Sequence, residues 1–313
     1  MALQCAVDGD GDLYGLGVRL GLYLQWLAGF LLRNFDGSWE TISAVRTANN
    51  VLCSTLVLAI VVNTTKGTAL PTDYLIVYYL TIALFYSESY HLLSSNDDDD
   101  DDDDAPGCYL RPDVPLTYQN LLFAFATIFG AWFWISGQDH TRPLTCGTPP
   151  KAALLATFDL QSHSWRKFAA TFAVLVGLIF LFFFLVHLYA LLAGIKAGVT
   201  SKAAIHVAVA FELYSGHPMG LLAMLSHVQQ TGLKFILGHG LMYFGEGGFI
   251  AMLASVVVFQ WFVLNVIGPL IAIVSVERML RENNLQTSPI PESSGQMIAL
   301  ATGVAGFLMA AWD

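Results

Sequence analysis

Phe168–Leu192, FAATFAVLVGLIFLFFFLVHLYALL, is an apolar segment without a single Asp, Glu, Lys or Arg. It exceeds the roughly 20 apolar residues with which a helix crosses the hydrocarbon core of a bilayer, so it predicts a transmembrane helix. The whole chain of 313 residues shares this character, because 55% of it is hydrophobic and 12% is charged. Soluble proteins carry about 25% charged residues. The sequence therefore predicts an all-α fold, a polytopic transmembrane helical bundle.

Similar apolar stretches on both sides of this segment predict seven or eight spans in all. The stretches between them are too short for a separate soluble domain, so we interpret residues 1–313 as a single transmembrane domain. Residues 203–225 are left open as the eighth span, because they contain Glu212 and because Pro218 would kink a helix. The other predicted spans are residues 13–32, 48–65, 73–93, 115–136, 168–193, 247–276 and 296–312.

A run of consecutive aspartates, Asp97–Asp104, fixes one connection in water. It supplies most of the formal net charge of −10, so the rest of the chain is nearly neutral and a nucleic-acid partner is not expected. Blocks of like charge are usually unstructured and have no fixed coordination geometry. We therefore interpret residues 94–114 as a low-complexity acidic loop that attracts Ca²⁺ or Mg²⁺ only loosely.

Three acids are candidates for catalysis: Glu88, Asp139 and Glu212. Glu88 lies near the far end of the predicted span 73–93, and ionisable groups inside membrane helices are costly and usually functional. A carboxyl group held away from water suits a general acid. Each acid also has a plain structural interpretation. Glu88 is then solvated at the interface or bonded to a neighbouring helix, Asp139 is a loop residue, and Glu212 lies on a surface.

Six residues are candidates for substrate binding. Arg19 lies inside the first span and needs a carboxylate, a carbonyl or an anionic ligand group, unless it extends to the lipid headgroups. His91 shares a helix face with Glu88. Asn49 could orient an acid, or it could simply join two helices by a hydrogen bond. Aromatic rings that face into a bundle stabilise cations through their negative faces. The six residues are Arg19, Asn49, His91, Trp132, Phe133 and Trp134.

No metal or other cofactor is expected from the pattern of potential ligands. Five of the eight histidines lie between His187 and His239, but the nearest pair, His217 and His227, is ten residues apart. Two metal ligands on one helix need a spacing of three or four residues. Cysteines in CxxC spacing are also absent. A metal-dependent oxidase is therefore not predicted.

Two stretches carry a resemblance to a known family. Leu13–Trp26, LYGLGVRLGLYLQW, and Gly295–Leu308, GQMIALATGVAGFL, resemble fungal integral-membrane terpene cyclases of the ascochlorin and ascofuranone type, which act in meroterpenoid biosynthesis. The order of the spans is also similar to that of the family. The catalytic residues named above rest on physical arguments and are not carried over from the family.

The resemblance implies a non-redox, acid-initiated terpene cyclase, an isomerase or lyase of secondary metabolism. Its substrate would be a lipophilic prenylated molecule that enters from the lipid bilayer, and its location would be the endoplasmic reticulum or another endomembrane. A cation transporter or channel, a small-molecule transporter and a membrane sensor stay open as alternatives from another class. A scaffold protein without a small-molecule site is a third interpretation. The sequence predicts no oligomeric state.

Overall fold

The structure is a computed structural model that describes residues 7–34, 38–85, 93–95, 108–110, 114–142, 149–154, 157–196 and 262–313. The contacts divide the chain into two compact units. The first consists of residues 1–88, 115–185 and 268–313, and the second of residues 89–114 and 186–267. All of the site residues discussed below that the structure describes belong to the first unit, which is described by itself.

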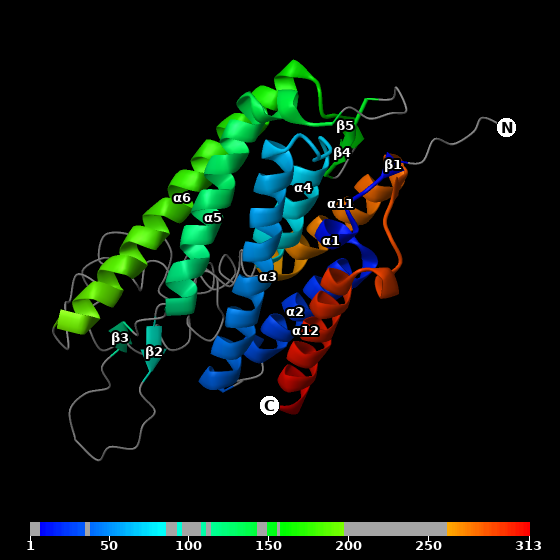
Figure 1. Cartoon of the computed structure of the whole chain (residues 1–313). Helices are drawn as coiled ribbons and strands as arrows, with labels where there is room; N and C mark the ends of the chain where they lie inside the picture. The colour runs from blue at the N-terminus through cyan, green and yellow to red at the C-terminus, as the bar shows by residue number, and fades with distance from the viewer. Residues whose placement is uncertain are drawn as a thin grey trace, which may run out of the picture. The chain divides into compact units, whose positions relative to one another are not determined.

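Helices dominate the described residues (Figure 1). Five of them are long and apolar enough to cross a membrane, which is compatible with an integral membrane protein. These five spans are Gly11–Leu32, Glu40–Thr65, Val114–Ile135, His163–Tyr189 and Ser294–Trp312. The helices are α1 (Gly11–Tyr14), α2 (Leu16–Asn34), α3 (Trp39–Thr65), α4 (Asp73–Tyr78), the π-helix η1 (Tyr79–Ala83), α5 (Val114–Ile135), the 3₁₀ helix η3 (Gly137–His140), α6 (His163–Lys196), the π-helix η4 (Val263–Ile267), α11 (Gly268–Glu282), the 3₁₀ helix η5 (Ile290–Glu292) and α12 (Ser294–Trp312).

Five predicted spans coincide with these five helices. The predicted span 73–93 corresponds to a shorter apolar helix, Asp73–Ala83, and its end lies outside the described residues. The segment 203–225 lies wholly outside them. Of the predicted span 247–276, the structure describes only residues from 262 onward, where η4 leads into α11. A total of seven or eight spans therefore stays a prediction.

Helix α3 begins nine residues before the predicted span. The Ser38 hydroxyl caps it by accepting a hydrogen bond from the Thr41 amide at 3.4 Å, and Glu40 lies in its first turn. Both features favour a helix start. The first turns carry Arg46, Asn49 and Asn50, and all three are buried. Hydropathy alone misplaced this boundary, because polar residues on a buried helix face resemble a loop in sequence.

The first and last long helices, α2 and α12, pack closely along their length (Figure 1). Glycines make this approach possible, since a Cβ atom on Gly17 would lie 2.6 Å from the Gln296 carbonyl oxygen. Gly21 and Gly303 are equally constrained by opposing backbone. Gln296, which is fully buried, accepts a hydrogen bond from the Gly17 amide at 3.1 Å. Small residues thus bring the two backbones together, as is common between membrane helices.

Short strands, which the sequence analysis did not predict, connect the helices. β1 (Val7–Asp8) pairs in parallel with β6 (Leu285–Gln286), and β4 (Lys151–Ala153) pairs with β5 (Thr157–Asp159) in an antiparallel hairpin. Asn283 holds the hairpin by binding both the amide and the carbonyl of Lys151, each at 2.8 Å. In the second unit, β2 (Leu93–Ser95) pairs with β3 (Cys108–Leu110) on either side of the aspartate run. Strands of two or three residues are too short to show an alternating pattern in sequence.

Candidate functional site

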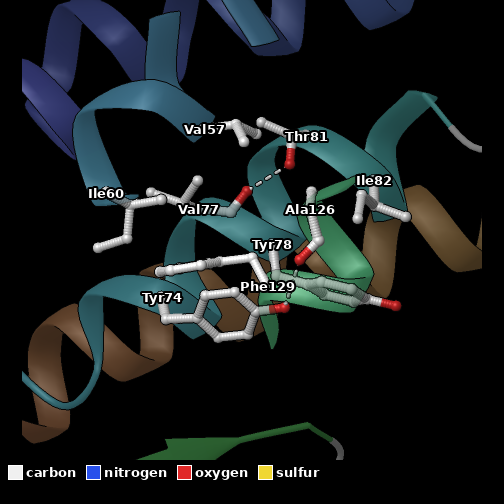
Figure 2. Close-up of a pocket in the computed structure, with 9 residues that line it drawn as sticks. All are labelled: Val57, Ile60, Tyr74, Val77, Tyr78, Thr81, Ile82, Ala126 and Phe129. Atoms are coloured by element: carbon white, nitrogen blue, oxygen red, sulfur yellow. Dashed lines mark hydrogen bonds between the residues drawn. The ribbon is translucent and has the colours of Figure 1, made fainter. Parts of the chain in front are cut away.

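An apolar pocket lies between α3, the α4–η1 segment and α5 (Figure 2). Its free interior volume is about 10 Å³. This volume has room for about one water molecule and lies far below the roughly 300–1,000 Å³ of sites for drug-sized ligands, so a prenyl chain would enter only if the lining side chains moved apart. The lining residues are Val57, Ile60, Tyr74, Val77, Tyr78, Thr81, Ile82, Ala126 and Phe129.

A π-helical turn, η1, forms part of the pocket wall. It spans Tyr79–Ala83 and follows α4 directly. The Thr81 hydroxyl donates to the Val77 carbonyl oxygen at 2.7 Å, as the dashed line in Figure 2 shows. Single π-helical turns inside α-helices are rare and occur often at functional sites. The widened turn therefore adds weight to this pocket as the candidate site.

Aromatic rings extend from the pocket toward the end of α5. The Tyr74 ring lies 6.0 Å from Phe129 and stacks on Phe133 at 4.8 Å. Its hydroxyl donates to the Ala126 carbonyl oxygen at 3.2 Å. Gly130 faces this hydroxyl and leaves room for it, because a Cβ atom there would collide with the Tyr74 oxygen. One wall is thus a fixed set of rings held between two helices.

Asp73 supplies a buried carboxyl group at the start of α4, next to Tyr74 in the chain. Only 2% of its surface is exposed. Its Oδ1 accepts a hydrogen bond from the Tyr14 hydroxyl at 2.8 Å, and its Oδ2 accepts one from the Leu70 amide at 2.8 Å. Among the residues that the structure describes, Asp73 has no ion-pair partner. It is the one acid in that part of the chain whose side chain is fully withdrawn from solvent.

A polar cluster connects this carboxyl to the protein surface. The Tyr14 hydroxyl accepts a hydrogen bond from the Asp10 amide at 3.1 Å. The Asp10 carboxylate caps α1 and accepts a further bond from Asn63 at 2.8 Å. Asp10 is partly exposed, whereas Tyr14 and Asp73 are buried. The cluster therefore leads from a half-exposed acid to a buried one.

Three buried amide side chains outside the pocket lining lie on α3 and α5. Asn50 donates to the Pro115 carbonyl at 2.7 Å, and Gln119 donates across to the Phe85 carbonyl at 3.2 Å. Asn120 donates to Leu116 in its own helix at 3.0 Å. The side-chain oxygens of Gln119 and Asn120 are buried and accept no hydrogen bond within the described part of the chain. Neither these amides nor Asp73 is among the residues that line the pocket.

Of the three acids predicted from the sequence, the structure describes only Asp139, and its side chain is not buried as that of Asp73 is. Asp139 lies in η3 with 72% of its side chain exposed, and it faces Arg166 at 3.8 Å. It therefore lacks the burial that we expected of an acid in a dry pocket. Glu88 and Glu212 lie outside the described residues, as does His91.

Arg19 is paired within the protein. It binds the Glu277 carboxylate, and its Nε donates to the Tyr14 carbonyl at 3.0 Å. Tyr23 also donates to Glu277, at 3.1 Å. The Arg19 charge is therefore matched by a carboxylate of α11, away from the pocket lining. Asn49 is buried in α3 and is not among the lining residues either.

The three aromatic residues predicted to bind substrate, Trp132, Phe133 and Trp134, do not line the pocket but pack against residues that do. Phe133 is fully buried, and Trp134 contacts Tyr74 edge to face at 6.1 Å. Trp132 is 40% exposed and packs on Phe129 at 5.3 Å. All three rings thus support Tyr74 or Phe129, which line the pocket themselves. The sequence pattern predicts this cluster but not the rings that line the pocket.

Asp73 was missed because the sequence analysis treated it only as the first residue of a span. The available signal was its position: an acid follows Pro71-Thr72 and precedes the apolar run of α4 and η1 without a polar spacer. Hydrophobic periodicity contains no information on Tyr14, which lies 59 positions away in sequence. Only the packing of α1 against α4 reveals the pair.

Within the described residues, no group of three or more His, Cys, Asp or Glu side chains could hold a metal ion. The pocket lining offers phenol hydroxyls and apolar side chains, and the Asp73 carboxyl, which is not part of the lining, precedes the lining residue Tyr74. This set suits proton transfer to a lipophilic molecule. Comparisons of the chain with protein-family models, with curated proteins and with solved structures find no match.

Proposed function

We propose that this protein is a membrane-bound terpene cyclase that protonates an epoxide or alkene of a prenyl chain and cyclises the chain through carbocations. The observation that carries the proposal is the juxtaposition at α4: the buried Asp73 directly precedes Tyr74, whose ring lines the apolar pocket. Buried carboxylic acids act as proton donors in several enzymes. The resemblance of Leu13–Trp26 and Gly295–Leu308 to fungal cyclases of meroterpenoid biosynthesis supports the same proposal.

The reaction is a balanced isomerisation. The Asp73 carboxyl gives its proton to the epoxide oxygen, a C–O bond breaks, and the π electrons of the nearby alkene form a new C–C bond. The resulting cation loses a proton to a base, and the carboxylate regains one, so the product has the mass of the substrate. The rings of Tyr74, Tyr78 and Phe129 face the pocket and would stabilise the intermediate cation.

The lining of the pocket supports a cyclase over a conduit for ions. A conduit needs polar groups that continue from one face of the bundle to the other. Here the pocket lining contains no charged side chain, and aliphatic residues such as Val57, Val77 and Ile82 make up much of it. The free oxygens of Gln119 and Asn120 also differ from the fully paired polar groups that a scaffold protein would show.

The test is an isomerisation assay in nanodiscs with a prenyl-phenol that carries a terminal epoxide. We expect a cyclic product of unchanged mass, and a turnover at least 100-fold lower in Asp73→Asn, in line with the contribution of general acids. Asn retains an oxygen for the Leu70 amide and nearly the same volume, so the fold should persist. Asp139→Asn is the matched control, because it removes an exposed acid.

Glu88→Gln is assayed in parallel, since Glu88 is the acid that the sequence analysis favours. Loss of turnover in Glu88→Gln with full turnover in Asp73→Asn would move the proton donor to Glu88. Absence of a cyclic product with the wild-type protein, together with uptake of cations into protein-containing liposomes, would replace the cyclase proposal by a conduit.

A further inference from the structure

We infer that a lipophilic ligand enters the pocket sideways from the hydrocarbon of the membrane, between the rings of Tyr78 and Phe129, which act as a gate. The class of ligand rests on the proposed function, whereas the route concerns the pocket alone. Because the pocket has room for about one water molecule, any longer ligand has to displace lining side chains. Which side chains yield decides where the ligand enters.

Exposure distinguishes Tyr78 and Phe129 from the other lining residues. Both rings are partly exposed, and they come from different helices, α4 and α5. All the other residues that line the pocket are buried. Tyr78 and Phe129, both labelled in Figure 2, are thus the lining side chains that reach the outer surface of the bundle as well as the cavity.

The protein surface beside these rings faces lipid. Phe125 and Ile128, which flank Phe129 in α5, are exposed, and so is Leu58 in α3. Helix α5 contains no charged residue, and Phe129 lies six residues before its last residue, Ile135, or about 9 Å inside the helix. Apolar side chains exposed at that depth on a membrane-crossing helix contact hydrocarbon, so the gate opens to lipid rather than to water.

The ring contacts separate a fixed wall of the pocket from a movable one. Tyr74 stacks on the buried Phe133 at 4.8 Å, and its hydroxyl donates to a carbonyl of α5, so it cannot turn without losing both contacts. Phe129 also packs on Trp132, at 5.3 Å, but that ring is itself exposed. Tyr78 directly precedes the π-helical turn η1, and sharp bends of helices occur at such turns. Tyr78 and Phe129 can therefore swing toward the lipid while Tyr74 stays as the back wall.

The test measures how fast a lipid-dissolved probe reaches the buried wall of the pocket in nanodiscs. The probe is a farnesyl ether with a diazirine on its chain, which is supplied in the lipid and activated by a light flash at increasing times after mixing. Mass spectrometry gives the rate at which label appears on Val77 and Thr81, which are buried and line the pocket. We expect this rate to rise about tenfold in Tyr78→Ala and in Phe129→Ala, which corresponds to a barrier lower by about 1.4 kcal/mol.

Phe125→Ala is the matched control, because it removes an exposed ring of the same helix that does not line the pocket. Its labelling rate should equal that of the wild type. A second probe, with a sulfonate in place of the farnesyl chain, stays in water and should label neither Val77 nor Thr81 in any variant. Leucine replaces alanine at position 78 or 129 if the alanine variant does not fold.

The gate would be overturned by equal rates in the wild type and both ring variants, or by the same acceleration in Phe125→Ala. Label from the sulfonated probe, or no label on Val77 and Thr81 in any variant, would overturn it as well. The outcome is independent of catalysis. Faster labelling of the ring variants of a protein that forms no cyclic product would keep the gate and refute the cyclase, and a cyclic product with unchanged labelling rates would do the reverse.

Discussion

Two regions of the protein solve the packing of membrane helices in opposite ways. Where α2 meets α12, Gly17, Gly21 and Gly303 bring backbone against backbone. Where α4 and η1 meet α5, the contacts are made by the large rings of Tyr74, Phe129 and Phe133, and a pocket stays open. An interface made of glycines leaves no space for a ligand. It also tolerates no larger side chain, because the opposing backbone lies too close. A ring-lined interface can exchange side-chain contacts for ligand contacts. We therefore assign stability chiefly to the first region, and the proposed ligand site belongs to the second.

The largest expected effect on stability is at the α2–α12 interface. In Gly21→Ala the new methyl group would meet the Ala299 carbonyl, which is backbone and cannot turn away. We expect a loss of about 3 kcal/mol or more in the free energy of unfolding, at the upper end for overpacked sites. The measurement is the unfolding midpoint of the purified protein in detergent.

Gly177→Ala in α6 is the control for that change. Its methyl group would lie 3.0 Å from the Thr127 hydroxyl oxygen, so the side chain would have to give by only a few tenths of an ångström. Alanine also favours a helix over glycine by about 1 kcal/mol, so we expect little net change. Equal losses in Gly21→Ala and Gly177→Ala would remove the distinction between the two regions.

A smaller effect is expected at the ring-lined interface, and a second substitution should relieve it in part. Gly130→Ala places a methyl group against the Tyr74 hydroxyl, which should cost about 2 kcal/mol. Tyr74→Phe removes that oxygen along with its bond to Ala126. The double variant should therefore be more stable than Gly130→Ala alone. A double-mutant cycle measures the coupling, for which we expect at least about 1 kcal/mol. Strict additivity would show that the two residues do not meet.

The smallest expected effect concerns Asp313, just beyond the last span. Hydrogen bonds from Ser38, including one from its amide at 2.7 Å, lower the pKa of the Asp313 carboxyl. A group whose pKa is lowered by folding stabilises the protein above its unfolded pKa, near 4 for aspartate, and this contribution is lost as the pH falls through the folded value. Stability should therefore decrease slightly below pH 4.

Asp313→Asn should remove that pH-dependent step: its stability should lie slightly below that of the wild type at pH 7 and equal it at low pH, and the difference should be small because the site is exposed. The measurement is the unfolding midpoint as a function of pH for the two proteins. A step of equal size in Asp313→Asn would assign it to another acid.

The long helices were predictable because 20 apolar residues give a signal that does not depend on their neighbours. Helix α5 begins and ends within one residue of its predicted bounds. The start of α3 was not predictable from hydropathy, since Arg46 and Asn49 are polar but buried. The short strands and the β4–β5 hairpin depend on tertiary contacts such as the pair of bonds from Asn283.

The candidate site was predictable only in its parts. The sequence indicates an aromatic cluster at residues 132–134, and the structure uses these rings to support Tyr74 and Phe129. It also indicates that a buried acid matters, but the buried acid of the described region is Asp73, whose partner Tyr14 comes from the first helix. Such a pairing follows from how the helices pack, which a single sequence does not record.

The most direct test of the central assignment is photolabelling of the nanodisc-embedded protein with a prenyl-phenol that carries a diazirine on its chain, followed by mass spectrometry of the peptides. The account predicts labels on the pocket-lining segments of α4, η1 and α5, at residues 74–82 and 126–129, and their loss when unlabelled prenyl-phenol is added in excess. Labels concentrated on α2 and α12 that respond to the same competitor would contradict it.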